Sequence, residues 1–218
     1  MPSNGCSLVA EIACRGGNRY SVAHISEWLR ATIMDTVSFT SMGAGTREDY
    51  AFLGQFRGED RTQVADNLLS FLKRLDGPTN GLKINRYQHS LQTATRAYRD
   101  GADEETVVCA LLHDIGDMLA PDNHSQIAAA ILRPFVSEKN YWIVFHHGLF
   151  QGYYYYHHIG KDRDGRERFR DHPHYQACVD FCERWDQSSF NPDYDTLTLE
   201  FFEPMVRRLF AGEPRGLD

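Results

Sequence analysis

The sequence predicts an all-α fold, and three observations support this prediction. From Asp60 onward, apolar residues recur at spacings of three and four, which is the period of an amphipathic helix. Residues that typically begin or end helices flank these runs. No comparable stretch shows the alternation of a half-buried strand. With 218 residues, of which 42% are hydrophobic and 24% charged, the chain can bury a full core.

The first 59 residues lack this periodicity, and we expect them to form a partly irregular N-terminal extension. An irregular leader is expected over 1–20, a short helix over 22–34, and a loop with brief structured pieces over 36–57. Several glycines in the last of these ranges favour turns over regular structure. The predicted helical domain then covers residues 60–212.

Three helices are expected in the first half of this domain. Acidic side chains can accept hydrogen bonds from the free N–H groups of a first turn, and glycine or proline commonly ends a helix. On these criteria Asp60 caps the first helix and Asp103 caps the third. The expected ranges are about 60–75, 85–100 and 103–111.

Four further helices are expected in the second half. The first two cover about 127–132 and 138–150, and a polar, Arg-rich loop follows them. Pro173 suits the first position of the next helix, because an N–H group there would have no partner within the helix. The last helix covers about 199–209 and is closed by Gly212.

Composition excludes several classes of protein. The net charge of −7 disfavours binding to a nucleic-acid backbone. The longest uncharged stretch, 141–160, contains four histidines and four consecutive tyrosines, so it is too polar to cross a membrane. No basic segment followed by an apolar run opens the sequence, and the five cysteines are scattered. We therefore expect a cytoplasmic protein that acts on a small molecule, without a membrane or nucleic-acid partner.

Histidines concentrate between His113 and His158, and the most informative string among them is LLHDIGD, residues 111–117. Imidazole and carboxylate groups are common ligands of iron, zinc and manganese. Adjacent residues on a regular helix diverge by about 100°. His113 and Asp114 can therefore bind one metal only if the helix loosens there, and Gly116 makes this plausible.

Three motifs together resemble the HD-domain metalloprotein superfamily over about residues 60–210. They are YQHSLQTA with His89, LLHDIGD with His113 and Asp114, and ERWDQ with Asp186. The resemblance implies a compact helical bundle in which these four residues hold a metal ion.

Two further histidines lie where members of the superfamily with two metals carry additional ligands. They are His124 in NHSQIAAAIL and His147 in IVFHHGLFQ. His146 competes with His147, which we prefer because HGLFQ aligns better with the corresponding family segment. The resemblance then implies a dinuclear site that is bridged by the carboxylate of Asp114.

Within the superfamily, the chain is similar to a branch of mixed-valent diiron oxygenases that includes myo-inositol oxygenase and an oxygenase that cleaves a hydroxyphosphonate. The similarity implies two iron ions, Fe(II) and Fe(III), with dioxygen as co-substrate. The expected reaction is oxidative cleavage of a carbon–carbon or carbon–heteroatom bond in a small hydroxylated polar substrate. The alternative is a dinuclear phosphohydrolase that uses Mn, Zn or Fe on a phosphate ester or nucleotide.

Several positions depart from the family pattern. Thr79 and Leu82 replace a Tyr and a Glu that precede the first ligand in the phosphonate enzyme, and Tyr50 is the candidate substitute. Asp117, Glu183 and Gln151 stand where relatives have basic or hydrogen-bonding residues. Because acidic groups favour amines and hydroxyls, we expect Asp117 and Glu183 to act catalytically on such a substrate. Gln151 is expected to bind it.

The insertion GYYYYHHIGKDRDGRERFRDH, residues 152–172, has two interpretations. As a lid, it would enclose the substrate with tyrosine rings, and a basic side chain would meet an anionic group. The basic residues of the segment are Lys161, Arg163, Arg166, Arg168 and Arg170, and Tyr153 and Arg163 are the preferred candidates. Alternatively, it is a solvated, charge-paired loop packed by its aromatic residues.

Overall fold

The computed structural model describes residues 35–215, without the side chains of residues 57–62. The expected leader over 1–20 and helix over 22–34 lie outside the described residues. The chain divides into two compact units, Met1–Glu59 and Asp60–Asp218, and each is described here by itself.

The described part of the N-terminal unit holds a short helix, α3 (Arg47–Gly54), after a 3-10 turn, η1 (Met42–Ala44). The sequence predicted mainly loop here. The helix forms because Thr46 and Asp49 make a capping box. The Asp49 carboxylate accepts a hydrogen bond from the Thr46 backbone N–H at 2.9 Å, while Thr46 Oγ1 accepts one from the Asp49 N–H at 3.2 Å.

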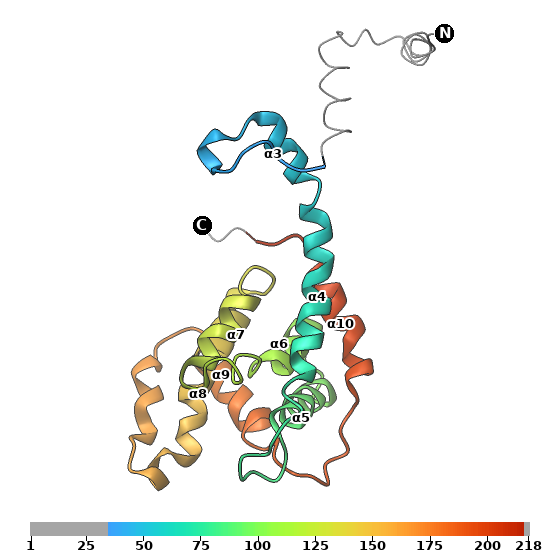
Figure 1. Ribbon diagram of the computed structural model, residues 1–218. Coiled ribbons are helices and arrows are strands. Elements are labelled where there is room, and N and C mark those ends of the chain that lie inside the picture. Colours follow the sequence, from blue (N-terminus) through green and yellow to red (C-terminus); the bar gives the residue numbers. More distant parts are fainter. Residues whose placement is uncertain (1–34, 216–218) are drawn as a thin grey trace, which may run out of the picture. The chain divides into compact units, whose positions relative to one another are not determined.

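The second unit is a bundle of helices, and residues 35–215 contain no strand (Figure 1). The predicted all-α fold is confirmed. Short helical turns, η2 to η5, connect or extend the α-helices. The α-helices are α4 (Arg57–Lys73), α5 (Arg86–Arg99), α6 (Glu104–Leu112), α7 (His124–Leu132), α8 (Glu138–Tyr155), α9 (Tyr175–Phe181) and α10 (Leu199–Ala211).

Helix α6 is the centre of this bundle. Every residue from Thr106 to Leu112 is buried, and the helix contacts α5, α8 and α10. A helix that is apolar on all sides is stable only when neighbours cover it. Burying one leucine side chain stabilises the fold by about 1.5–3 kcal/mol. Moving a neighbouring helix away would expose such side chains of α6, so their burial holds the neighbours in place. The candidate site lies directly after its last turn.

The expected Asp60 cap is wrong, because α4 begins at Arg57 and Asp60 lies inside it, but the next helix termini agree with the sequence. Asn85 and Gln88 form a capping box at the start of α5, and Asp103 accepts a hydrogen bond from the Thr106 N–H at 2.8 Å. Ser137 caps α8 in the same way. Two of the expected helices, over 85–100 and from 103, are therefore confirmed with their termini.

Helix α8 is longer than predicted, because it continues past Phe150 to Tyr155. Gly152 does not end it, since the missing side chain leaves room for the ring of Tyr156 to pack on the helix backbone. The following residues form 3-10 turns, η3 (Tyr156–Ile159) and η4 (Arg163–Phe169), where the sequence predicted a loop. Neither α8 nor any other helix of the described residues has the length and apolar character needed to cross a membrane.

The next helix also differs from the prediction. Helix α9 begins at Tyr175, two residues after Pro173, and it continues into a single π-helical turn, η5 (Cys182–Asp186). A π turn inserts one residue into the helix and rotates everything after it, and such turns are frequent at functional sites. Here the turn ends on Asp186.

Candidate metal centre

Four imidazole rings from separate segments meet at one place in the second unit. They belong to His89 on α5, His113 after α6, His124 at the start of α7 and His147 on α8. The rings of His89 and His113 have centroids 5.1 Å apart, and those of His124 and His147 lie 5.2 Å apart. His113 and His147, at 4.8 Å, connect the two pairs.

Each of these rings is oriented by a backbone carbonyl at Nδ1. Because a carbonyl oxygen only accepts hydrogen bonds, each Nδ1 carries a proton, and Nε2 is the ring atom left to bind a metal ion or a second proton. The four Nε2 atoms face the centre of the cluster. The bonds are His89 Nδ1 to Ser189 O at 2.8 Å, His113 to Ala110 O at 2.8 Å, His124 to Pro121 O at 2.7 Å and His147 to Val144 O at 2.7 Å.

The carboxylate of Asp114 lies between the two pairs of rings. Its Oδ1 atom is 3.2 Å from His124 Nε2 and 3.3 Å from His147 Nε2. Its Oδ2 atom is 3.5 Å from His89 Nε2 and 3.7 Å from His113 Nε2. One oxygen therefore faces each pair of imidazoles.

Local backbone geometry brings His113 and Asp114 to the same cluster. Helix α6 ends at Leu112, and turns follow, with Ile115 N–H bonded to Leu112 O at 3.0 Å. This is the loosening that the HDIG string predicted. Gly116 lets α7 approach closely, since a Cβ atom there would stand 2.7 Å from the carbonyl oxygen of His124.

Asp186 completes the cluster from the π turn. Its Oδ1 atom is 3.2 Å from His89 Nε2 and 3.6 Å from His113 Nε2, and it accepts a hydrogen bond from Gln151 Nε2 at 3.1 Å. Its Oδ2 atom is buried and has no hydrogen-bond partner among the described residues. A buried carboxylate oxygen without a partner is costly unless a cation satisfies it.

The titration behaviour reflects these contacts. Burial opposes the charge on Asp114, but His113, His147, His89 and Arg86 hold its pKa well below the usual range. The pKa of Asp186 is lowered in the same way by His113 and His89. Burial would lower the pKa of His113, yet the two carboxylates raise it to about 9. Burial lowers the pKa of His147.

The donor set fits a metal ion. His89, His113 and Asp186 each offer one ligand atom, all within 4.8 Å of one another, and His113, Asp114 and His147 do the same. Imidazole nitrogen with carboxylate oxygen suits iron, manganese or zinc. Cations would satisfy the four imidazole Nε2 atoms and the Asp186 oxygen that has no partner. The two buried groups of His and Asp residues can therefore hold a metal.

The structure brings His147 to this cluster and turns His146 away from it. His146 packs against Trp142 at 4.3 Å and Phe169 at 4.6 Å between ring centroids. Burial, with the nearby charges of His172 and Arg168, lowers the pKa of His146 to about 4. His146 is thus a neutral packing residue on a different face of α8.

A cavity of about 660 Å³ opens onto the cluster. Its walls include aromatic side chains, among them Phe190, which stacks on the His89 ring with centroids 4.5 Å apart. Tyr154 and Tyr155 at the end of α8, with Tyr156 at the start of η3, form another part of the lining. The cavity is large enough for a small polar molecule next to the metal ligands.

Arg86 is a site residue that sequence reasoning missed. It lies one turn before His89, lines the cavity, and places Nη1 3.3 Å from Asp114 Oδ2 and Nε 3.3 Å from Asp117 Oδ2. Its position three residues before the first ligand, on the same helix face, was the available signal.

The other predicted substrate residues fall in different places. Gln151 lines the cavity and holds Asp186. Asp117 pairs with Arg86, and Glu183 is exposed; neither is part of the cavity lining. Tyr153 and Arg163 are also outside this lining, and they stack on each other with the guanidinium carbon 4.0 Å from the ring centroid. Tyr50 is in the N-terminal unit, where its hydroxyl donates to the Met42 carbonyl.

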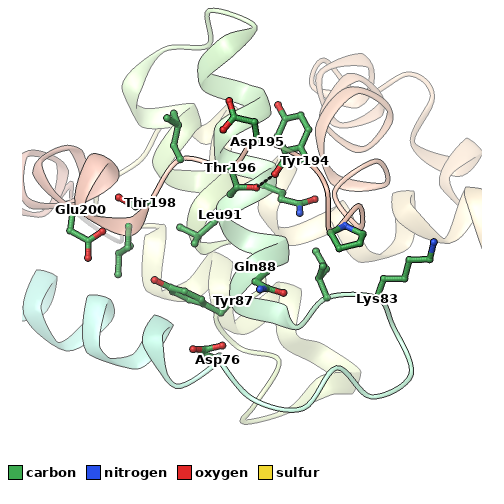
Figure 2. Close-up of a pocket in the computed structure, with 15 residues that line it drawn as sticks. Asp76, Lys83, Tyr87, Gln88, Leu91, Tyr194, Asp195, Thr196, Thr198 and Glu200 are labelled. Carbon is green, nitrogen blue, oxygen red and sulfur yellow. Dashed lines mark hydrogen bonds between the residues drawn. The ribbon is translucent and has the colours of Figure 1, made fainter.

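A second cavity, of about 700 Å³, contains none of the six clustered residues (Figure 2). It lies between α5 and the segment that leads into α10, and Figure 2 shows Tyr87 with Asp76 and Glu200 on either side. Its acidic groups are partly engaged, because Asp76 accepts a hydrogen bond from Asn85 and Asp195 pairs with Arg99. We assign the chemistry to the cavity at the histidine cluster.

Comparison with protein families agrees with this geometry. Residues 86–184 match the family described as HD domain. The match supports the HD superfamily and indicates a metal-dependent enzyme. It covers five of the six clustered residues and ends two positions before Asp186. A comparison with curated proteins finds no match.

Proposed function

We propose that the cluster holds two metal ions bridged by Asp114, and that the protein is a diiron oxygenase. The observation that carries the dinuclear assignment is the division of the Asp114 carboxylate, whose Oδ1 faces His124 and His147 while Oδ2 faces His89 and His113. A single ion would leave one of these pairs without a ligand role. In this assignment Asp186 binds the ion that is held by His89 and His113.

The redox assignment rests on the resemblance of the sequence to the diiron oxygenase branch, and the donor set supports it. Four neutral imidazoles and two carboxylates suit iron in both of the oxidation states that a mixed-valent pair requires. Bound iron would supply dioxygen activation and would lower the pKa of a coordinated substrate hydroxyl. The proposed reaction is oxidative cleavage of a bond in a small hydroxylated polar substrate.

The protein's own residues orient the ligands and exclude water. The four carbonyl contacts at Nδ1 fix the imidazole rings, and Gln151 holds Asp186 with a hydrogen bond of 3.1 Å. The stacked ring of Phe190 shields His89. Arg86 neutralises part of the charge of Asp114 and Asp117 at the cavity wall. A preorganised site of this kind positions substrate beside the metals with little rearrangement.

Anaerobic reconstitution with Fe(II), followed by partial oxidation, tests this proposal. We expect two iron ions per chain, a coupled mixed-valent EPR signal, and oxygen uptake that depends on a hydroxylated substrate. The His147→Gln variant should lose about half of the iron, whereas His146→Gln, at the neighbouring packing position, should keep both ions. One iron per chain in the unsubstituted protein would contradict the proposal.

A second candidate function is phosphoester hydrolysis by the same metal pair. Arg86 and Lys161 favour it, since both line the cavity and a phosphoryl group needs positive charge around it. This reading predicts phosphate release from a panel of nucleotides and phosphate esters with Mn(II), and no oxygen uptake that depends on substrate. Hydrolysis without oxygen consumption would replace the oxygenase assignment.

A further inference from the structure

The charges that line the cavity at the histidine cluster point to the kind of substrate. Two carboxylates in the lining, Asp114 and Asp186, belong to the proposed metal ligands, and bound cations would neutralise them. The remaining charged groups in the lining are Arg86, Lys161 and Asp122. With the metals in place, the interior is therefore positively charged, which favours an anionic ligand.

The two basic side chains differ in what they already bind. Arg86 contacts Asp114 and Asp117 at 3.3 Å each, so its guanidinium group is largely engaged. The Lys161 ammonium has no carboxylate partner among the described side chains, and it lies over the Tyr156 ring, 5.5 Å from the centroid. Lys161 is thus the cation in the lining that remains available to a ligand.

The local backbone holds Lys161 at the cavity wall. Gly160 adopts a left-handed conformation with φ 71°, and the Lys161 N–H donates to the Tyr156 carbonyl at 2.9 Å. The Tyr156 ring packs on Gly152 of α8. These contacts tie the turn that bears Lys161 to the helix that bears His147, so the Lys161 backbone is held beside the cavity while its side chain stays free to reach a ligand.

Asp117 and Glu183, the two acidic residues that were expected to favour an amine, do not reach the cavity lining. Asp117 is neutralised by Arg86, and Glu183 is exposed on η5. We propose that the substrate carries an oxyanion group, either a carboxylate or a phosphoryl group, which Lys161 binds while the metal centre holds the reacting hydroxyl. This inference rests on the proposed metal centre and adds the substrate class that it accepts.

Binding measurements on the anaerobic, metal-loaded protein test this assignment without requiring turnover. The probes are glycolate and glycerol 3-phosphate as anions, with ethylene glycol and glycerol as their uncharged counterparts and ethanolamine as the cation. Calorimetry should show an affinity for at least one anion about tenfold above that of its neutral counterpart. Glycolate and glycerol 3-phosphate distinguish a carboxylate from a phosphoryl group.

The Lys161→Gln variant should lose this preference, and Lys161→Arg should retain most of it. Arg168→Gln is the matched control, because Arg168 is an exposed cation in the same segment and lies outside the cavity lining. It should bind the anions as the unsubstituted protein does. Metal content of each variant shows whether the centre is intact.

Equal affinity for charged and neutral probes, failure of both anions to bind, or tighter binding of ethanolamine would overturn the inference. So would anion binding that is unchanged in Lys161→Gln. None of these results would alter the iron content or the EPR signal, so failure of this inference is distinguishable from failure of the proposed metal centre.

Discussion

His89 and His113 face each other with their Nε2 atoms 3.2 Å apart, although both rings already use Nδ1–H to donate to backbone carbonyls. Two neutral imidazoles in this arrangement would oppose lone pair to lone pair. Either a proton or a cation must lie between them. Because the pKa of His113 is raised to about 9, a proton occupies this position in the metal-free protein at neutral pH, and a metal ion would replace it.

This replacement predicts that metal binding depends on pH. Below about pH 9 the metal-free His113 carries a proton that the metal must displace, so affinity should rise with pH up to that value, by at most about tenfold per unit for one proton. Calorimetric titrations with Mn(II) at pH 7.5, in buffers of different ionisation enthalpy, should show proton release. Affinities that are independent of pH between 7 and 9 would argue against this arrangement.

Asp114→Asn should abolish the metal centre, because a neutral amide cannot bridge two cations as a carboxylate does. The loss of affinity should exceed the roughly 10–100-fold that removal of an outer hydrogen-bond partner costs. Metal content after dialysis measures it. Asp122→Asn, which changes an exposed carboxylate of the same cavity, is the control and should keep its metal. Equal metal content in both variants would remove Asp114 from its proposed role.

Gln151→Ala should weaken metal binding without removing a ligand. Gln151 donates to Asp186 Oδ1 at 3.1 Å, and its loss frees that carboxylate to rotate. We expect a decrease in affinity of about 10–100-fold. Gln176→Ala is the matched control, since the Gln176 side chain donates to Asp180 at an exposed position away from the cluster. Unchanged affinity in Gln151→Ala would show that the π turn alone orients Asp186.

Gly116→Ala should displace the start of α7 and with it His124. The added Cβ would stand 2.7 Å from the His124 carbonyl oxygen and 2.9 Å from Ile127 Cβ, so one of these must move. Such overpacking costs about 1–3 kcal/mol of stability. Thermal unfolding and metal content together should show a folded protein that has lost one ion. Gly77→Ala is the control, because nothing lies within 4 Å of a Cβ there.

The sequence predicted the helices for local reasons, and it predicted the clustered residues through the resemblance of three motifs to the HD superfamily. Helix caps such as Asp103, and the period of apolar residues, act within a few positions of the chain. The HDIG string also predicts a local change in the backbone, since the chain must leave the helix for His113 and Asp114 to converge. These features depend little on distant parts of the protein.

Other features depend on packing between distant segments. The helix was expected to end at about Phe150, but it continues to Tyr155 because the Tyr156 ring packs against the backbone at Gly152. The π turn before Asp186 lies where α9 packs on α8 and η5 on α5, contacts that periodicity cannot show. Lys161 was one of several basic candidates in its segment, and the structure shows that it lines the cavity whereas Arg163 does not.

Anomalous diffraction at the iron absorption edge, from crystals of the reconstituted protein, would test the dinuclear centre most directly. We predict two peaks about 3.5–4 Å apart, the usual separation in two-metal sites, on either side of the Asp114 carboxylate. One should contact His124 and His147, and the other His89, His113 and Asp186. A single peak at full occupancy, or peaks away from Asp114, would contradict the account.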